Sequence, residues 1–171
     1  MQPPPVHPAA LGAEQLLADC ESRRLRRSGP GGQHRNKVET AWLLLHRPTG
    51  LKAEASERRS QAENRRVALF RLRVNLALEV RRPVGEDYRP SPLWQSRCRA
   101  RQVQVSPAHD DFPAILAEAL DVIAACGADL KAAAEMLGCT ASQLVKLLKK
   151  EGRALALVNA RRAAEGLKPL R

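Results

Sequence analysis

The sequence is poor in aromatic residues and has no long apolar run. Phe, Trp and Tyr make up only 3% of its 171 residues, whereas 44% are hydrophobic. A core must therefore be aliphatic, which favours helices and argues against all-β sandwiches and barrels. No stretch approaches the roughly 20 apolar residues of a membrane-spanning helix, so we expect no membrane partner.

Metal-ligand spacing and targeting signals are missing as well. The four cysteines are Cys20, Cys98, Cys126 and Cys139. None forms a pair at two-residue spacing or has companion histidines at zinc-ligand distance, so we expect reduced thiols, no metal and no cofactor. The start of the chain lacks the basic and apolar regions of a signal peptide, and no arginine precedes Arg23. A cytoplasmic location is expected.

The positive charge is unevenly distributed along the chain. The net charge is +11. Residues 1–106 hold 20 Lys and Arg against 10 Asp and Glu, a net of +10, whereas residues 107–171 hold 9 against 8, a net of +1. Such a chain seeks polyanions, nucleic acid first among them. We therefore expect the main polyanion-binding surface in the first part.

The first part of the sequence predicts a small α+β domain over residues 13–82. Residues 1–12 are proline-rich and expected to be disordered, and a short helix is expected near residues 13–20. The apolar run 41–45 and the alternating run 51–55, joined by Arg47-Pro48-Thr49-Gly50, predict an antiparallel hairpin. Ser60 and Glu63 form a capping box before an amphipathic helix of about twenty residues, expected to pack on the hairpin.

Residues 83–112 predict a linker, and residues 113–171 a helical domain. The linker has Pro83, Gly85, Pro90, Pro92 and Pro107 and little regular patterning, but it contains Trp94 and the basic run Arg97, Arg99 and Arg101. We favour a solvated connection, with Trp94 against the first domain, over direct RNA contact. His109-Asp110-Asp111 and Asp121 could suggest a metal site, but helix-cap and surface roles fit better.

The helical domain contains a helix-turn-helix pattern. Asp129 caps one helix, which stops at Gly138, and Thr140 opens the next. This stretch resembles the helix-turn-helix of Fis-like DNA-binding proteins. The second helix carries Lys146, Lys149 and Lys150, which suit contact with rRNA or tRNA phosphates. A module for packing or protein contact remains an equal alternative.

The loop Ser28-Gly29-Pro30-Gly31-Gly32-Gln33 carries the clearest chemical signal. Adjacent glycines adopt backbone angles closed to other residues and let the main chain approach another molecule closely. Such a loop exposes amide N–H groups, and an N–H aimed at a developing oxyanion is a main source of rate in acyl transfer.

The longer string from Arg27 to Lys37 resembles the catalytic loop of class I peptide chain release factors and their ribosome-rescue relatives. The resemblance extends through the hairpin to the start of the long helix, over about residues 20–82. It implies that the loop enters the peptidyl transferase centre, where water attacks the ester of peptidyl-tRNA and the Gln33 N–H stabilises the transition state. Gly31 and Gly32 would hold the backbone shape, and Gln33 would be a target for N5-methylation by a glutamine methyltransferase.

The resemblance also implies partners and further contact residues. The expected partners are the ribosome, with its 23S-type rRNA, and peptidyl-tRNA, bound by a monomer. Basic and polar residues expected to contact RNA are Arg27, His34, Arg35, Asn36, Lys37, Arg59, Arg65 and Arg66. Most relatives have a small apolar residue in place of Arg35, and solvated charges on a helix face explain the last three arginines equally well.

Only about twenty residues precede the resembling segment, too few for a codon-reading region, so the expected function is codon-independent peptidyl-tRNA hydrolysis on stalled ribosomes or large subunits. Two alternatives remain. One is a non-enzymatic ribosome or nucleic-acid adaptor that uses the helix-turn-helix, and the other is hydrolysis of free peptidyl-tRNA.

Overall fold

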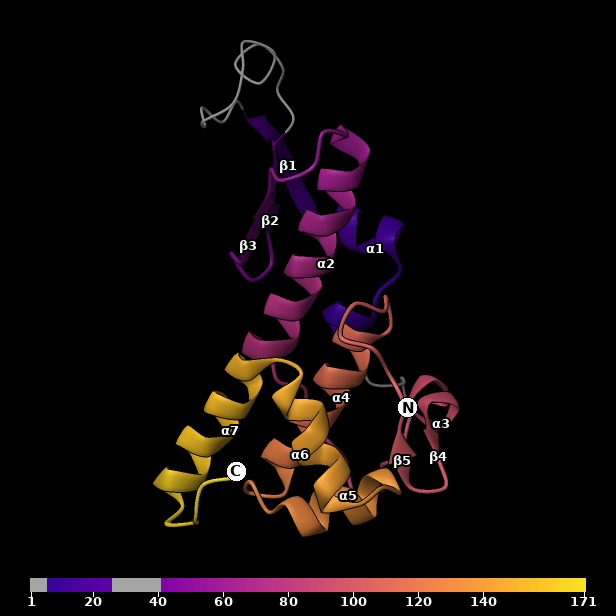
Figure 1. Cartoon of the computed structure of the whole chain (residues 1–171), viewed down its shortest axis with the longest axis vertical. Helices are drawn as coiled ribbons and strands as arrows, with labels where there is room; N and C mark the ends of the chain where they lie inside the picture. The colour runs from indigo at the N-terminus through magenta and orange to yellow at the C-terminus, as the bar shows by residue number, and fades with distance from the viewer. Residues whose placement is uncertain (1–5, 26–40) are drawn as a thin grey trace. The chain divides into compact units, whose positions relative to one another are not determined.

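The structure is a computed structural model that describes residues 6–25 and 41–171 (Figure 1). It consists of two compact units. One unit is Leu11–Leu76, and the other is Ala77–Arg171 together with the segment that ends at Ala10. A small antiparallel sheet and several helices confirm the predicted α+β class. No helix within the described residues is long and apolar enough to cross a membrane.

The first unit is built on a three-stranded antiparallel sheet of order β1-β2-β3. Its elements are α1 (Ala13–Ala18), β1 (Cys20–Leu25), β2 (Ala41–His46), β3 (Lys52–Ala55) and α2 (Gln61–Glu79). The apolar β2 is central and buries Ala41 and Leu44. The sequence did not predict β1, because its middle residues are polar and exposed at the sheet edge.

The predicted turn between β2 and β3 is confirmed. His46 O accepts hydrogen bonds from the main-chain N–H of Thr49 at 3.3 Å and of Gly50 at 2.8 Å. Gly50 has a φ of +72°, the left-handed conformation that closes this hairpin without a steric penalty. The His46 ring lies 2.7 Å from Thr49 Oγ1, and burial lowers the pKa of His46, so the ring serves the turn as a neutral group.

The start of α2 is fixed by one predicted and one unpredicted side chain. Ser60 Oγ accepts the N–H of Glu63 at 3.4 Å, as the capping box predicts. The side chain of Asn64 is fully buried and bonds to both main-chain groups of Arg58, accepting at 2.9 Å and donating at 2.8 Å. Along the helix, Arg71 donates to Glu54 O and Asn75 to Lys52 O, which fastens α2 to β3.

The second unit is built around the buried helix α4. Its elements are η1 (Pro8–Ala10), α3 (Pro92–Arg97), β4 (Cys98–Arg99), β5 (Gln102–Val103), α4 (Phe112–Ala125), α5 (Leu130–Leu137), α6 (Ala141–Lys149) and α7 (Gly152–Ala164). The predicted caps are confirmed: Asp129 accepts the N–H of Lys131, Thr140 accepts the N–H of Gln143, and Gly138 ends α5 at φ +68°. The α5–α6 pair is the predicted helix-turn-helix.

The segment expected to be a linker is folded and belongs to this second unit. Trp94 is 1% exposed, and its indole nitrogen donates to Leu137 O at 2.8 Å, so it packs on the helical domain instead of the first domain. Glu118 of α4 accepts bonds from Tyr88 Oη at 2.6 Å, Ser91 N at 2.7 Å and Ser91 Oγ at 2.5 Å. Because these partners are far apart in the sequence, no local pattern indicates them.

The expectation of disorder at the start of the chain also differs from the structure, as far as residues 6–12 are concerned. η1 contacts α4, and Ala9 is fully buried. His7 Nδ1 accepts the N–H of Ala9 at 3.0 Å, and its Nε2 lies 3.2 Å from Val80 O. Burial lowers the pKa of His7 to about 4, so the ring is neutral at pH 7. It links the start of η1 to Val80.

A buried carboxylate makes the stability of the second unit pH-dependent. Asp121 accepts bonds from Arg81 Nη1 at 3.1 Å and Arg82 N at 3.0 Å, yet burial outweighs these partners and raises its pKa from 3.8 to about 6. The native state then holds this proton more tightly than the unfolded state does. The contribution of Asp121 to stability is full below about pH 4 and is lost as the pH rises through 6.

We predict that Asp121→Asn removes this loss. From pH 4 to 7, the unfolding free energy of Asp121→Asn minus that of the parent should rise by up to about 3 kcal/mol, the equivalent of the shift. The difference is the measured quantity because His7 titrates with the opposite sign. Urea unfolding in a Trp42→Phe background, which leaves Trp94 as the sole tryptophan, follows this unit. The exposed Asp87→Asn is the control, and an equal rise in both would contradict the assignment.

Candidate functional site

The structure fixes the two ends of the segment that carries the Gly-Gly-Gln sequence. The predicted catalytic residues Gly31, Gly32 and Gln33 lie outside the described residues, as do Arg27, His34, Arg35, Asn36 and Lys37. Leu25 ends β1, Ala41 begins β2, and the two are partners in the antiparallel register. Their Cα atoms are therefore held about 5 Å apart. Leu25 and Ala41 thus lie together at one end of the β1–β2 pair.

Beside this point, two arginines stack on one tryptophan. Arg24 of β1 pairs directly with Trp42 of β2. Its guanidinium lies 5.4 Å from the centroid of the Trp42 ring, and that of Arg65 on α2 lies 5.6 Å away. These are cation–π distances. The stack joins β1, β2 and α2 directly behind the residues from which the Gly-Gly-Gln segment starts and ends, and sequence reasoning had not singled out Trp42 or Arg24.

The arginines on α2 and just before it fall into two groups. Arg71 is tied to Glu57 at 2.5 Å and to Glu54 O at 2.8 Å, and Arg73 donates to Leu11 O at 2.8 Å. By contrast, Arg59 and Arg66 are exposed, with no ion pair to any described residue. The latter two can therefore meet an RNA phosphate without first breaking an internal contact, whereas Arg65 is held over Trp42.

The predicted lysines of the helix-turn-helix also differ from one another. Lys146 and Lys149 are exposed on α6, with no ion pair among the described residues. The Nζ of Lys150 instead donates to Val105 O, which joins the end of α6 to the chain after β5. RNA contact by all three stays a prediction, but Lys150 already has a partner inside its own unit.

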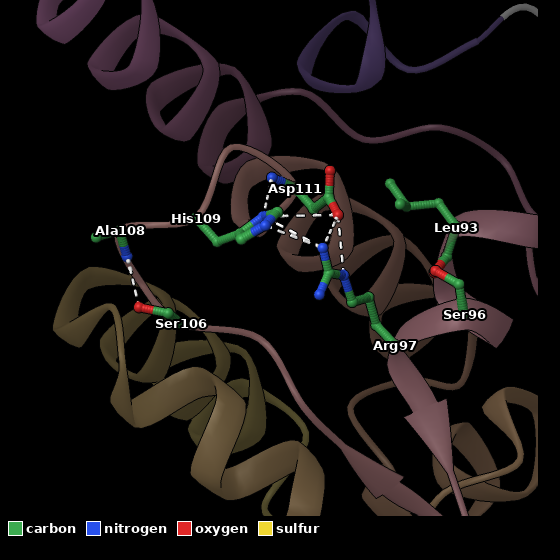
Figure 2. Close-up of polar contacts among 7 residues, drawn as sticks. All are labelled: Leu93, Ser96, Arg97, Ser106, Ala108, His109 and Asp111. Carbon is green, nitrogen blue, oxygen red and sulfur yellow. Dashed lines mark hydrogen bonds and ion pairs between the residues drawn. The ribbon is translucent and has the colours of Figure 1, made fainter.

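The cluster of His109 and Asp111 is organised by an arginine (Figure 2). Arg97 Nε and Nη2 donate to Asp111 Oδ2 at 2.9 and 2.6 Å, and Nη2 lies 3.0 Å from His109 Nε2. Asp111 N lies 3.1 Å from His109 Nδ1. A neutral imidazole has one acceptor nitrogen, so only one of these two His109 contacts is a hydrogen bond at a time. The cluster fastens the end of α3 to the start of α4, and the described residues contain no group of ligands fit for a metal.

Three features define a small α+β domain of the release-factor type. They are the antiparallel sheet, the long helix bonded to its edge strand, and the Gly-Gly-Gln sequence between two paired strands. The family model described as the RF-1 domain matches residues 16–103, just over half of the chain. The chain belongs to this family.

Known relatives are peptide chain release factors. The chain is 36% identical over 88 residues to the chloroplastic peptide chain release factor PrfB1 of Arabidopsis thaliana, which covers 52% of the chain and 18% of that protein. It is 36% identical over 92 residues to peptide chain release factor 1 of Rickettsia typhi, covering 53% of the chain and 26% of the relative. With peptide chain release factor 2 of Variovorax paradoxus the identity is 48% over 59 residues, 34% of the chain and 16% of the relative. The chain thus matches about a quarter or less of the length of each.

The Arg65–Trp42 contact can be measured as a coupling energy. We predict that a double-mutant cycle of Arg65→Gln and Trp42→Leu gives about 0.5–1 kcal/mol in the free energy of unfolding, the usual value for an exposed cation–π pair. The matched cycle with Arg66→Gln removes the same charge from the next residue and should give a coupling near zero. Equal couplings at the two positions would show that the arginine stack contributes nothing specific.

Proposed function

We propose that this chain hydrolyses the ester of peptidyl-tRNA on the ribosome and does so without reading a codon. The observation that carries the proposal is the sequence Gly31-Gly32-Gln33, placed between β1 and β2 of a domain in the RF-1 family. The partners are the ribosome, through its peptidyl transferase centre and 23S-type rRNA, and peptidyl-tRNA. A glutamine methyltransferase acting on Gln33 is part of the same proposal.

The chemistry follows from the main chain. Water adds to the ester carbonyl carbon, the carbonyl oxygen becomes an oxyanion, and the Gln33 N–H donates to it. The C–O bond to the tRNA ribose then breaks, the ribose oxygen takes a proton, and the peptide leaves as a carboxylic acid. Gly31 and Gly32, which lack side chains, allow this close approach of the backbone. This mechanism requires no ionisable side chain from the protein.

The contacts at the base of the segment support this role. A segment rich in glycine loses much conformational entropy when it is held in one place. The Leu25–Ala41 pairing and the stack of Arg24, Trp42 and Arg65 restrict where its ends can be. The exposed Arg59, just before α2, and the exposed Arg66 on α2 offer charge for rRNA phosphates. The protein therefore supplies both an anchor and a polyanion-binding surface for the catalytic segment.

Independence from codons is the finer part of the proposal. Residues 104–171 lie beyond the family match and form most of the second unit. Their helix-turn-helix presents Lys146 and Lys149 to solvent. Attachment through phosphates is insensitive to sequence, so these helices provide a means of holding the ribosome that does not depend on a stop codon.

We predict that Gly32→Ala, which adds a side chain next to the Gln33 N–H, and Gln33→Pro, which removes that N–H, each reduce peptide release by at least about 100-fold, the cost of losing one well-placed oxyanion contact. Release of labelled peptide from purified ribosome complexes measures this effect. Gly85→Ala is the matched control, because a methyl group there meets no neighbour within 4 Å. Full peptide release by both loop variants would contradict the proposed mechanism.

A second prediction concerns the substrate. Release from ribosomes stalled on a messenger without a stop codon should be at least as fast as from ribosomes at a stop codon. Release only at a stop codon would contradict codon independence while leaving the hydrolysis intact. Hydrolysis of peptidyl-tRNA in the absence of ribosomes would favour a hydrolase of free peptidyl-tRNA. Ribosome binding with no hydrolysis in any assay would favour a non-enzymatic ribosome adaptor.

A further inference from the structure

The β4–β5 hairpin lies directly against the helix-turn-helix. Arg101 Nη2 donates to Cys139 O at 2.9 Å, in the turn between α5 and α6. Val103 N donates to the side-chain oxygen of Gln143 on α6 at 3.3 Å, and Cys98 Sγ lies 3.7 Å from Gly138 O. Three points of the hairpin thus meet the turn and the first residues of α6. The hairpin and α6 form one continuous surface.

The tip of this hairpin has a strained backbone. Ala100 and Arg101 have φ values of 48° and 62°, both in the left-handed region. Two successive left-handed residues make the tight turn that suits the twist of a two-stranded hairpin, but Asn-Gly is the usual pair there. Ala and Arg are unfavourable in this conformation. Strain that persists at an exposed tip points to a use for the side chains it displays.

Exposed cations continue from the hairpin along α6. Arg99 and Arg101 lie on either side of Ala100 at the hairpin tip and are exposed. On α6, the exposed residues Ser142, Lys146 and Lys149 follow one another at the spacing of a single helix face. Among the described residues, Arg99, Lys146 and Lys149 make no ion pair. We call Arg99, Arg101, Ser142, Lys146 and Lys149 the hairpin–α6 face.

Two acidic groups of the helix-turn-helix region are engaged with their own neighbours. Glu151, next to the end of α6, is paired with Arg153 at 2.8 Å, and Asp129 caps α5 through the N–H groups of Lys131 and Ala132. Both carboxylates are therefore committed to their own neighbours. The charge of the hairpin–α6 face is available to a polyanion.

We propose that the hairpin–α6 face binds the sugar–phosphate backbone of an RNA double helix, without regard to its sequence. The choice of RNA as the ligand rests on the proposed function, because an enzyme that hydrolyses peptidyl-tRNA on the ribosome is surrounded by RNA helices. It assigns the β4–β5 hairpin, which the sequence placed in a linker, a binding role beside α6.

The composition of the face explains why it reads no bases. Sequence readout in a groove relies on bidentate side chains such as Arg, Asn and Gln on the recognition helix. The only amide on α6 is Gln143, and its oxygen already accepts the N–H of Val103. The helix then offers a hydroxyl and two ammonium groups, which suit phosphates. The major groove of an RNA helix is too narrow for a recognition helix, so α6 lies across the backbone and the hairpin contacts the next stretch of phosphates.

The test compares two triple variants of the full chain that remove the same charge. Arg99→Gln, Lys146→Gln and Lys149→Gln together neutralise the face, and Arg89→Gln, Lys168→Gln and Arg171→Gln neutralise three exposed residues elsewhere in this unit. The probes are two unrelated RNA duplexes of about 20 base pairs, longer than the span of a known double-stranded RNA-binding domain, and a DNA duplex. Affinity is measured between about 50 and 200 mM KCl. Tryptophan fluorescence verifies that each variant is folded.

We expect the face variant to bind RNA at least tenfold more weakly and to lower the slope of log affinity against log salt by about two to three, one per lost phosphate contact. The control should match the parent protein, and the two RNA sequences should bind alike. Ala100→Gly, which relieves the turn without removing charge, should keep its affinity. Equal losses in the two triple variants, or a preference for one duplex sequence or for DNA, would overturn the proposal.

The same measurements separate this proposal from the proposed function. Gly32→Ala should bind RNA duplexes like the parent while losing peptide release. If Gly32→Ala keeps full peptide release, the enzymatic proposal fails. The duplex-binding comparison still tests whether the hairpin–α6 face binds RNA. If the face variant binds RNA like its control while release depends on Gly32, only the present inference fails.

Discussion

The antiparallel pairing of β1 with β2 is the constraint on which the rest of the first unit depends. It pairs Leu25 with Ala41, the described residues on either side of the Gly-Gly-Gln segment. The pairing is supported from outside the sheet, because Arg65 on α2 stacks on Trp42 while Arg71 and Asn75 bond to the main chain of β3. These contacts fix the two described residues, Leu25 and Ala41, between which the Gly-Gly-Gln sequence lies in the chain.

Charge is distributed differently in the two units, and the net count hides the difference. Residues 11–76 hold 14 basic and 7 acidic residues, a net of +7, and the remaining residues hold 15 and 11, a net of +4. In the second unit several of the acidic groups act inside the fold. Glu118 binds Tyr88 and Ser91, Asp121 binds Arg81, and Asp111 binds Arg97. Cations such as Lys146 and Lys149 are left unbalanced at the surface, so near-neutrality along the sequence does not imply a neutral face.

What the sequence could predict follows from the range of the interactions involved. The turn at Pro48-Thr49-Gly50 and the caps at Ser60, Asp129 and Thr140 depend on residues within a few positions of one another, and all agree with the structure. The strand β1 and the folded segment around Trp94 depend on partners tens of residues away. Likewise, composition identified basic residues as a class, but it could not separate the stacked Arg65 from the exposed Arg66, or the internally bonded Lys150 from Lys149.

The RF-1 family match and the first compact unit end at different residues. The RF-1 match extends to residue 103, whereas the compact first unit ends at Leu76. Residues 77–103 thus belong to the family segment by sequence and to the helical unit by packing. They hold that unit through Trp94 to Leu137, Arg101 to Cys139 and Val103 to Gln143. The helix-turn-helix is therefore built onto the family segment itself, and a hairpin within the family match becomes part of the surface that the added helices present.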